Sequence, residues 1–237
     1  MRKLFALSLF AALILTATSC FRAHRIEGNY NLITVDRNLP PFYGVESTDD
    51  LDVEIVHDSL YFVEIEAEEN LIPYINTDVV NQSLRIETQP RRNLDPNYPI
   101  RIIVHTPTLN SIELSGSGSI VSDTVTTTQL QIKLSGSGSI TAIVDADNIN
   151  STISGSGDIH LSGIAQHANF KISGSGDIHA YALLLDECIA DISGSGNMYL
   201  SVADILDVVI SGSGNIYYFG NPSVSISING SGQLIHQ

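Results

Sequence analysis

The sequence lacks most signatures of common enzyme classes. It contains no nucleophile elbow, no P-loop, no dinucleotide-binding fingerprint and no cysteine cluster. Its two cysteines are Cys20 and Cys188, and the neighbours of Cys188 are acidic, whereas a reactive thiolate needs an electropositive setting. The sequence therefore predicts no catalysis at Cys188, which we interpret as a small buried hydrophobe, and no cofactor.

Basic residues are also scarce. The chain has 11 lysines and arginines against 26 aspartates and glutamates, which gives a formal net charge of −15 at pH 7. This balance argues against nucleic acid as a partner and against electrostatic binding to anionic lipid headgroups. Charged residues make up only 16% of the chain, so much of the outer surface must consist of Ser, Thr, Asn and Tyr.

A repeated tetrapeptide dominates the second half of the chain. We call these segments the glycine boxes: Ser-Gly-Ser-Gly begins at Ser115, Ser135, Ser154, Ser173, Ser193 and Ser211, and the variant Asn-Gly-Ser-Gly begins at Asn229. The boxes follow one another at intervals of 18 to 20 residues, and two glycines in each of seven boxes account for 14 of the 18 glycines. Such an even period predicts a solenoid.

Between the boxes, apolar or small residues recur with a period of two, which indicates β-strands. The predicted inward residues share one parity with the box glycines. Before the boxes they are Leu130, Ile132, Leu134, Ile149, Ser151, Ile153, Ala168, Phe170, Ile172, Cys188, Ala190, Ile192, Leu206, Val208, Ile210, Val224, Ile226 and Ile228. After the boxes they are Ile120, Ile140, Ile159, Ile178, Met198, Ile216 and Leu234. A 19-residue coil has a perimeter of about 60 Å and must bend around its own core. We therefore predict an all-β fold, a parallel β-helix of about seven coils. Glycine suits the bend because a Cβ would clash there or because the backbone needs a positive φ.

The chain is expected to divide into three parts. Residues 1–19 resemble a lipoprotein signal peptide, residues 20–108 form a β-rich N-terminal region, and residues 109–237 form the β-helix. The N-terminal region shows alternating runs such as 51–56 and 61–66, separated by turn signals. We expect it to cap the first edge of the solenoid, because an uncovered edge invites aggregation.

The first residues carry a targeting signal. Arg2 and Lys3 precede an apolar stretch from Leu4 to Ala17, and a run of small residues ends at Cys20. The stretch is too short for an ordinary transmembrane helix, and the small residues resemble a bacterial lipobox. Cys20 is then the expected lipid anchor, and an ordinary signal peptide that leaves Cys20 free is the alternative.

These features together resemble a known family. They are the lipoprotein-like signal, the runs Val53-Glu54-Ile55 and Tyr61-Phe62-Val63-Glu64-Ile65, the segment 106–109, and glycine boxes followed by Asp, Asn or Ser and then Ile. This combination is similar to the putative auto-transporter adhesin family with the head GIN domain. The resemblance implies a β-helical, envelope-associated protein of a kind common in Bacteroidetes, and it brings no catalytic residues.

Two consecutive boxes are followed by Asp-Ile-His. Asp158 and His160 recur one coil later as Asp177 and His179. Stacking would place two carboxylates and two imidazoles on one outward patch, within reach of a divalent cation such as zinc. The alternative is a plain polar ladder, because Ser139 and Thr141, or Asn197 and Tyr199, occupy the same positions in other coils. The sequence alone favours the ladder.

Three weaker patterns complete the candidate sites. Tyr199, Tyr217 and Tyr218 form a possible aromatic contact ladder for sugar or protein, or else reflect ordinary β-propensity. The acidic run Glu64, Glu66, Glu68 and Glu69 is interpreted as a solvated face. Asp58-Ser59-Leu60 and Asp123-Thr124-Val125 resemble the O-glycosylation sequon of Bacteroidetes, with Ser59 and Thr124 as acceptors.

The sequence leads to one favoured function and two alternatives. We expect a non-enzymatic lipoprotein of the outer membrane, facing periplasm or exterior, that presents a rigid β-helix to an envelope protein or glycan. The first alternative is a ligand- or metal-binding module that uses the Asp/His and Tyr ladders. The second is a carbohydrate-active enzyme, but its cleft would need long loops, and the 18- to 20-residue spacing leaves almost no room for them.

Overall fold

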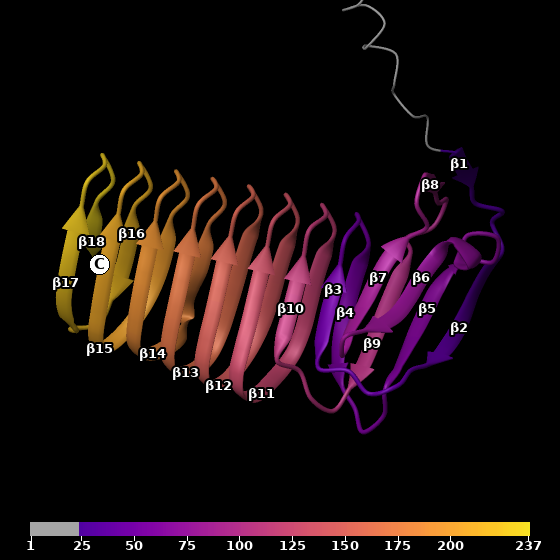
Figure 1. Cartoon of the computed structure of the whole chain (residues 1–237), viewed down its shortest axis with the longest axis horizontal. Coiled ribbons are helices and arrows are strands. Elements are labelled where there is room, and N and C mark those ends of the chain that lie inside the picture. Colours follow the sequence, from indigo (N-terminus) through magenta and orange to yellow (C-terminus); the bar gives the residue numbers. More distant parts are fainter. Residues whose placement is uncertain (1–23) are drawn as a thin grey trace, which may run out of the picture.

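The glycine boxes and the alternating runs between them form one stack of parallel coils, so the predicted parallel β-helix is confirmed (Figure 1). The computed structural model describes residues 24–237. The stack consists of β10 (Ser111–Leu114), β11 (Ser119–Leu134), β12 (Ser139–Ile153), β13 (Asp158–Ile172), β14 (Ile178–Ile192), β15 (Met198–Ile210), β16 (Ile216–Phe219), β17 (Ser223–Ile228) and β18 (Leu234–His236).

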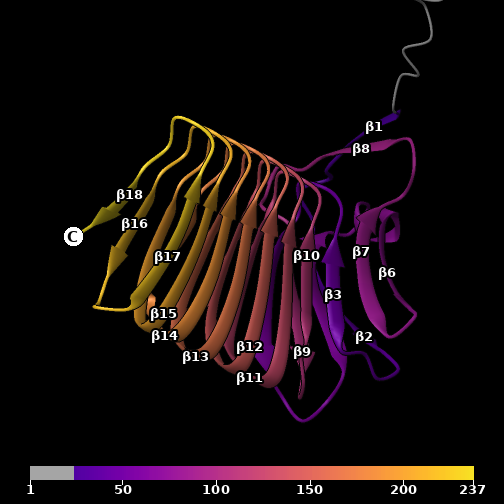
Figure 2. The same ribbon diagram turned by 60° about the vertical axis from the view of Figure 1, so that its left-hand side comes forward.

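Each long strand bends once, so that one coil contributes to two opposite faces of the stack (Figure 2). The glycine boxes make the turns along one edge, which is the upper edge in Figure 1. Successive coils pair in parallel and keep their repeats in phase: Ile140 lies beside Ile159, Ile159 beside Ile178, and Ile178 beside Met198. Repetition in the sequence thus becomes columns of like residues in space.

In the six Ser-Gly-Ser-Gly boxes, the serines are exposed, the first glycine is half-buried and the second glycine is buried. Neither of the two positive-φ glycines lies in a box, so positive φ, the second of the two expected reasons for glycine, does not apply there. Close approach is the reason instead. A Cβ on Gly174 would lie 1.9 Å from the carbonyl oxygen of Gly155, its counterpart one coil earlier.

The core is a set of inward columns that run the length of the stack. The predicted inward residues of β11 to β15 are buried, and Cys188 is among them. Phe170 is flanked in its column by two small residues, Ser151 and Ala190, which leave room for its ring. The hydroxyl of Ser151 is buried and has no hydrogen-bond partner among the described residues.

The inward prediction fails only where no further coil is stacked in the described structure. Val224, Ile226 and Ile228 of β17 are 38%, 50% and 40% exposed, although they have the inward parity. β17 pairs with β15 on one side and has no strand on the other.

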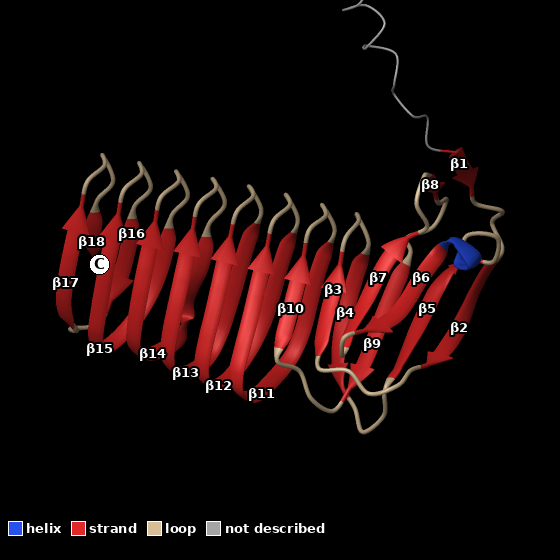
Figure 3. Ribbon diagram, viewed as in Figure 1, coloured by secondary structure: helices blue, strands red, loops and turns tan. Residues whose placement is uncertain are grey.

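The N-terminal region is β-rich, as predicted, and it adds strands to both faces of the stack (Figure 3). Its elements are β1 (His24–Glu27), β2 (Leu32–Asn38), β3 (Gly44–Ser47), β4 (Asp52–His57), β5 (Phe62–Glu68), the 3-10 helix η2 (Ile72–Tyr74), β6 (Ile75–Val80), β7 (Ser83–Thr88), β8 (Arg92–Asp95) and β9 (Arg101–Thr106). Within residues 24–237, no helix is long and apolar enough to cross a membrane.

β3 and β4 form a coil that has no glycine box. β3 pairs in parallel with β10, and β4 pairs in parallel with β11. The backbone of Asp49 and Leu51 takes the place of the box, because the Cβ positions of Gly116 and Gly118 would lie within 2.1 Å of their carbonyl oxygens. The carboxylate of Asp49 accepts the backbone N–H of Thr88.

Five further strands of the same sheet cap this first coil. On one face β7 pairs with β3, and β6 pairs antiparallel with β7. On the other face β9 pairs with β4, and β5 and β2 follow as antiparallel neighbours. The parallel edge is therefore covered by antiparallel strands, as expected for a solenoid cap.

One member of the acidic run is not solvated. Glu69 is exposed, but Glu68 is fully buried at the end of β5. Its carboxylate accepts the backbone N–H of Tyr30 at 2.6 Å and that of Asn97 at 2.7 Å. The interpretation of Glu68 as part of a solvated face is wrong, because two connections of the cap, 28–31 and 96–100, fold over it.

Candidate functional site

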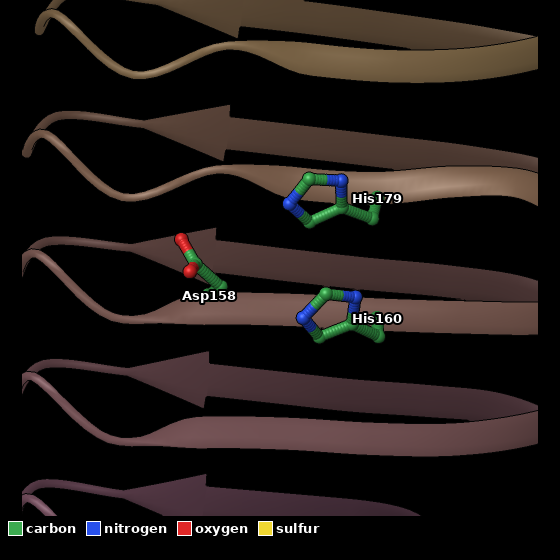
Figure 4. A group of neighbouring side chains, drawn as sticks. All are labelled: Asp158, His160 and His179. Atoms are coloured by element: carbon green, nitrogen blue, oxygen red, sulfur yellow. The ribbon is translucent and has the colours of Figure 1, made fainter.

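The two Asp-Ile-His segments lie on adjacent coils, directly after the box turns (Figure 4). Ile159 and Ile178 point inward and are fully buried, and His160 and His179 are partners in register between β13 and β14. Because side chains two residues apart on a strand share a face, Asp158 and His160 point outward together. The structure thus brings His160 and His179 together on one outer face.

The aspartates belong to a column of side chains that bond to the next coil. Asp158 Oδ1 accepts the backbone N–H of Asp177 at 2.8 Å, and Asp177 Oδ1 accepts the N–H of Asn197 at 2.6 Å. The pattern continues toward the last coil. Asn197 Oδ1 accepts the backbone N–H of Asn215 at 3.0 Å, and Asn215 Oδ1 accepts that of Gln233 at 2.9 Å. This column is a polar ladder with a structural role.

The side chains two residues later form a stack of rings. The centroids of His160 and His179 are 4.5 Å apart, those of His179 and Tyr199 are 4.8 Å apart, and those of Tyr199 and Tyr217 are 5.2 Å apart, with interplanar angles of 4 to 7°. Offset stacking of this kind stabilises by about 0.5–1.5 kcal/mol per pair. The ring stack therefore links four successive coils.

Three metal-ligating groups lie close together at one end of the ring stack, beside the column of aspartates and asparagines. One ligand atom each from Asp158, His160 and His179 lies within 4.8 Å of the other two. Asp177 does not belong to this cluster. Its Oδ1 also accepts a bond from the side-chain amide of Asn197 at 3.1 Å, and the ring one coil beyond His179 is Tyr199. The four predicted ligands thus become a group of three.

Partial desolvation of the exposed His160 ring lowers its pKa, and the neighbouring His179 lowers it further, whereas Asp158 opposes the shift. The lowered pKa favours the neutral imidazole, which has a ring-nitrogen lone pair. Burial also raises the pKa of Tyr199, so that its phenol stays protonated.

The aromatic contact ladder differs from its prediction. Tyr199 and Tyr217 stack, but Tyr218 has the opposite parity, pairs in register with the buried Leu200 and stacks on His236 at 4.8 Å. Within the ring stack, neighbouring rings cover the inner faces, so a sugar can reach only ring edges there. This arrangement argues against sugar stacking on Tyr199.

Two aromatic residues that were not among the predicted sites join this region. The ring of Tyr181 meets Tyr199 edge-on at 5.4 Å and Phe219 at 4.8 Å. Tyr181 lies two residues after His179, and Phe219 lies two residues after Tyr217. The period-two alternation of the sequence could therefore have placed both rings on the face of the ring stack.

The other predicted residues lie apart from this cluster. Cys188 is buried in the core, and burial raises the pKa of its thiol, which makes it an inert hydrophobe. Ser59 and Thr124 are both exposed, and their glycosylation stays a prediction. Cys20 lies outside the described residues.

Comparison with known proteins gives a consistent picture. Residues 41–222 match the family described as putative auto-transporter adhesin, head GIN domain. Among proteins with curated descriptions, none matches significantly.

Several solved structures resemble the chain. A putative adhesin from Bacteroides fragilis is 24% identical, with a TM-score of 0.85, and the match covers 90% of this chain and 100% of that one. A putative lipid binding protein from Parabacteroides distasonis is 26% identical, with a TM-score of 0.75 and coverage of 90% and 99%. A putative adhesin from Parabacteroides merdae is 23% identical, with a TM-score of 0.74 and coverage of 91% and 100%.

Proposed function

Because the chain belongs to the family of putative auto-transporter adhesins with the head GIN domain, we propose that it is a non-enzymatic adhesion protein of the bacterial cell envelope. The observation that carries this proposal is the uniformity of the coils. The box turns form an even row along the stack, and no long loop projects from β11 to β15 (Figure 1). An enzyme cleft on a β-helix needs such loops, whereas a contact surface needs only a rigid, repetitive face.

The orientation of the stack suits display from a membrane. Residue 24, where the described chain begins, lies at the capped end, and the last coils lie at the opposite end (Figure 1). A lipid on Cys20 would therefore hold the cap near the membrane. At about 4.8 Å per coil, the stack would extend the later coils roughly 30 Å outward. The partner proposed for this surface is an envelope protein or glycan.

The lipid anchor has a direct test. A labelled fatty acid should be incorporated into the wild-type protein in a bacterial host and not into Cys20→Ala. The Cys188→Ala variant is the matched control, because the second thiol is buried in the core and should not be acylated. Equal labelling of wild type and Cys20→Ala would refute the anchor.

Adhesion is tested separately. Isogenic bacteria with the wild-type chain, with Cys20→Ala or without the chain are compared for attachment to a surface coated with envelope glycans or envelope proteins. Wild-type cells should attach best, and purified chain added in solution should compete with them. Equal attachment of wild-type cells and cells that lack the chain would contradict the proposal, provided that the wild-type protein is present and folded.

A further inference from the structure

We propose that Asp158, His160 and His179 bind one divalent transition-metal ion, such as zinc, on the outer face of β13 and β14 (Figure 4). This site goes beyond the proposed adhesion and does not depend on it. Two imidazole nitrogens and one carboxylate oxygen are ligands that zinc and its neighbours in the first transition row accept. The formal net charge of −15 also favours a cation over an anion.

The spacing of the ligand atoms is close to what a metal needs. They lie within 4.8 Å of one another, and in a tetrahedral site with bonds of about 2.1 Å the ligand atoms are roughly 3.4 Å apart. The difference of at most about 1.4 Å is within reach of side-chain rotations. His160 is exposed, and Asp158 and His179 are half-buried, so these rotations need no change in the core.

Asp158 is already oriented for this role. One of its oxygens is held by the backbone N–H of Asp177 at 2.8 Å. A hydrogen bond to a ligating carboxylate fixes its direction and leaves the second oxygen free for the ion.

Stacking alone does not explain the two histidines. Tyr199 and Tyr217 occupy the same column in the next coils and also stack, at centroid distances of 4.8 and 5.2 Å, so the column does not require imidazole. The combination of one carboxylate with two imidazoles occurs only between β13 and β14 among the described residues.

The parallel rings oppose binding to a limited extent. Two stacked, parallel imidazoles point their nitrogens in parallel directions, so at least one ring must tilt for both nitrogens to reach the ion. Loss of one ring contact weakens affinity by up to about tenfold. With three protein ligands, a fourth position faces solvent, where water or a group from a partner would complete the coordination.

The test is isothermal titration of zinc chloride into the full chain, purified without a histidine tag. The wild type should bind one zinc per chain. His179→Tyr keeps a ring in the stack, as Tyr199 does, and Asp158→Asn keeps an acceptor for the next coil, as Asn197 does. Each of these variants should bind zinc at least tenfold more weakly and remain folded by circular dichroism.

One further variant completes the design. His167→Ser removes a histidine that pairs with Glu187 at 3.2 Å outside the cluster, and it should bind zinc as the wild type does.

The proposal fails if the wild type shows no saturable binding at one zinc per chain, or if His179→Tyr and Asp158→Asn bind as tightly as the wild type. If His167→Ser and His179→Tyr lose equal amounts of zinc affinity, the zinc binds to scattered histidines, and the proposed site is overturned.

Discussion

At the scale of single residues, the box glycines are needed because of the coil that precedes them. The Cβ position of each box glycine points at a backbone carbonyl one coil earlier, at distances of 1.7 to 2.1 Å. The first coil has no such predecessor, and its turn contains Asp49, Asp50 and Leu51 in place of a box. A glycine is therefore required only from the second coil onward.

This account predicts the effect of a side chain at Gly174. Gly174→Val should lower the free energy of unfolding by at least about 2 kcal/mol, because a Cβ would overlap the carbonyl oxygen of Gly155 and push the coils apart. Ser175→Ala is the control, since this exposed neighbour should change stability by no more than about 0.5 kcal/mol. Chemical denaturation measures both, and an unchanged midpoint for Gly174→Val would refute the close-approach explanation.

At the scale of elements, Glu68 joins three parts of the cap. It ends β5, and its oxygens accept backbone N–H groups from the connection between β1 and β2 and from the connection between β8 and β9. Burial raises the pKa of Glu68, but the hydrogen bonds from Asn97 and Tyr30 outweigh it, so the pKa lies below its ordinary value. The charged form is therefore the one that stabilises the cap.

The sign of this shift fixes a pH dependence. A carboxylate with a lowered pKa contributes its full stability above its ordinary pKa of about 4.3 and loses it as the pH falls through the lower folded value. Glu68→Gln should therefore lower the melting temperature by several degrees at pH 7, and the difference from wild type should shrink toward pH 3. Exposed Glu69→Gln should follow the wild type throughout. A constant difference between pH 7 and pH 3 would contradict this role.

At the scale of the whole molecule, the stack is modular. Each coil pairs with the coils before and after it, and equivalent residues keep one register, as in Ile172 beside Ile192 and Ile192 beside Ile210. In such a solenoid, stability is approximately a sum over coils and their interfaces. A complete coil should therefore be removable without loss of the fold.

Deletion of residues 193–210 tests this modularity, because it joins Ile192 to the next box at Ser211 and leaves the cluster at Asp158 intact. The shortened protein should unfold cooperatively, with a melting temperature lower by about 10 °C at most. Deletion of the nine residues 193–201 is the matched control. This deletion removes only half a coil, so the residues that follow cannot complete both faces of the stack, and this variant should lose the fold. Similar circular dichroism and melting of both deletions would contradict the modular description.

The solenoid, its coil length and the parity of its core follow from the amino-acid sequence alone, because period-two alternation and the spacing of the boxes are local properties of the chain. Residues such as Ile140, Ile159 and Ile178 fall into one column by their spacing from the boxes, and strand pairing places them side by side. The β-rich character of the cap followed from alternation in the same way.

Which side chains meet depends on the tertiary structure. Asp158 and not Asp177 joins the two histidines, because the contact depends on the register and hydrogen bonds between coils. Glu68 is buried because Tyr30 and Asn97, 38 and 29 residues away in sequence, fold over it. The first coil, formed by β3 and β4, could not be predicted from the sequence either. It has no glycine box, and it joins the stack through backbone hydrogen bonds, which leave no repeat in the sequence.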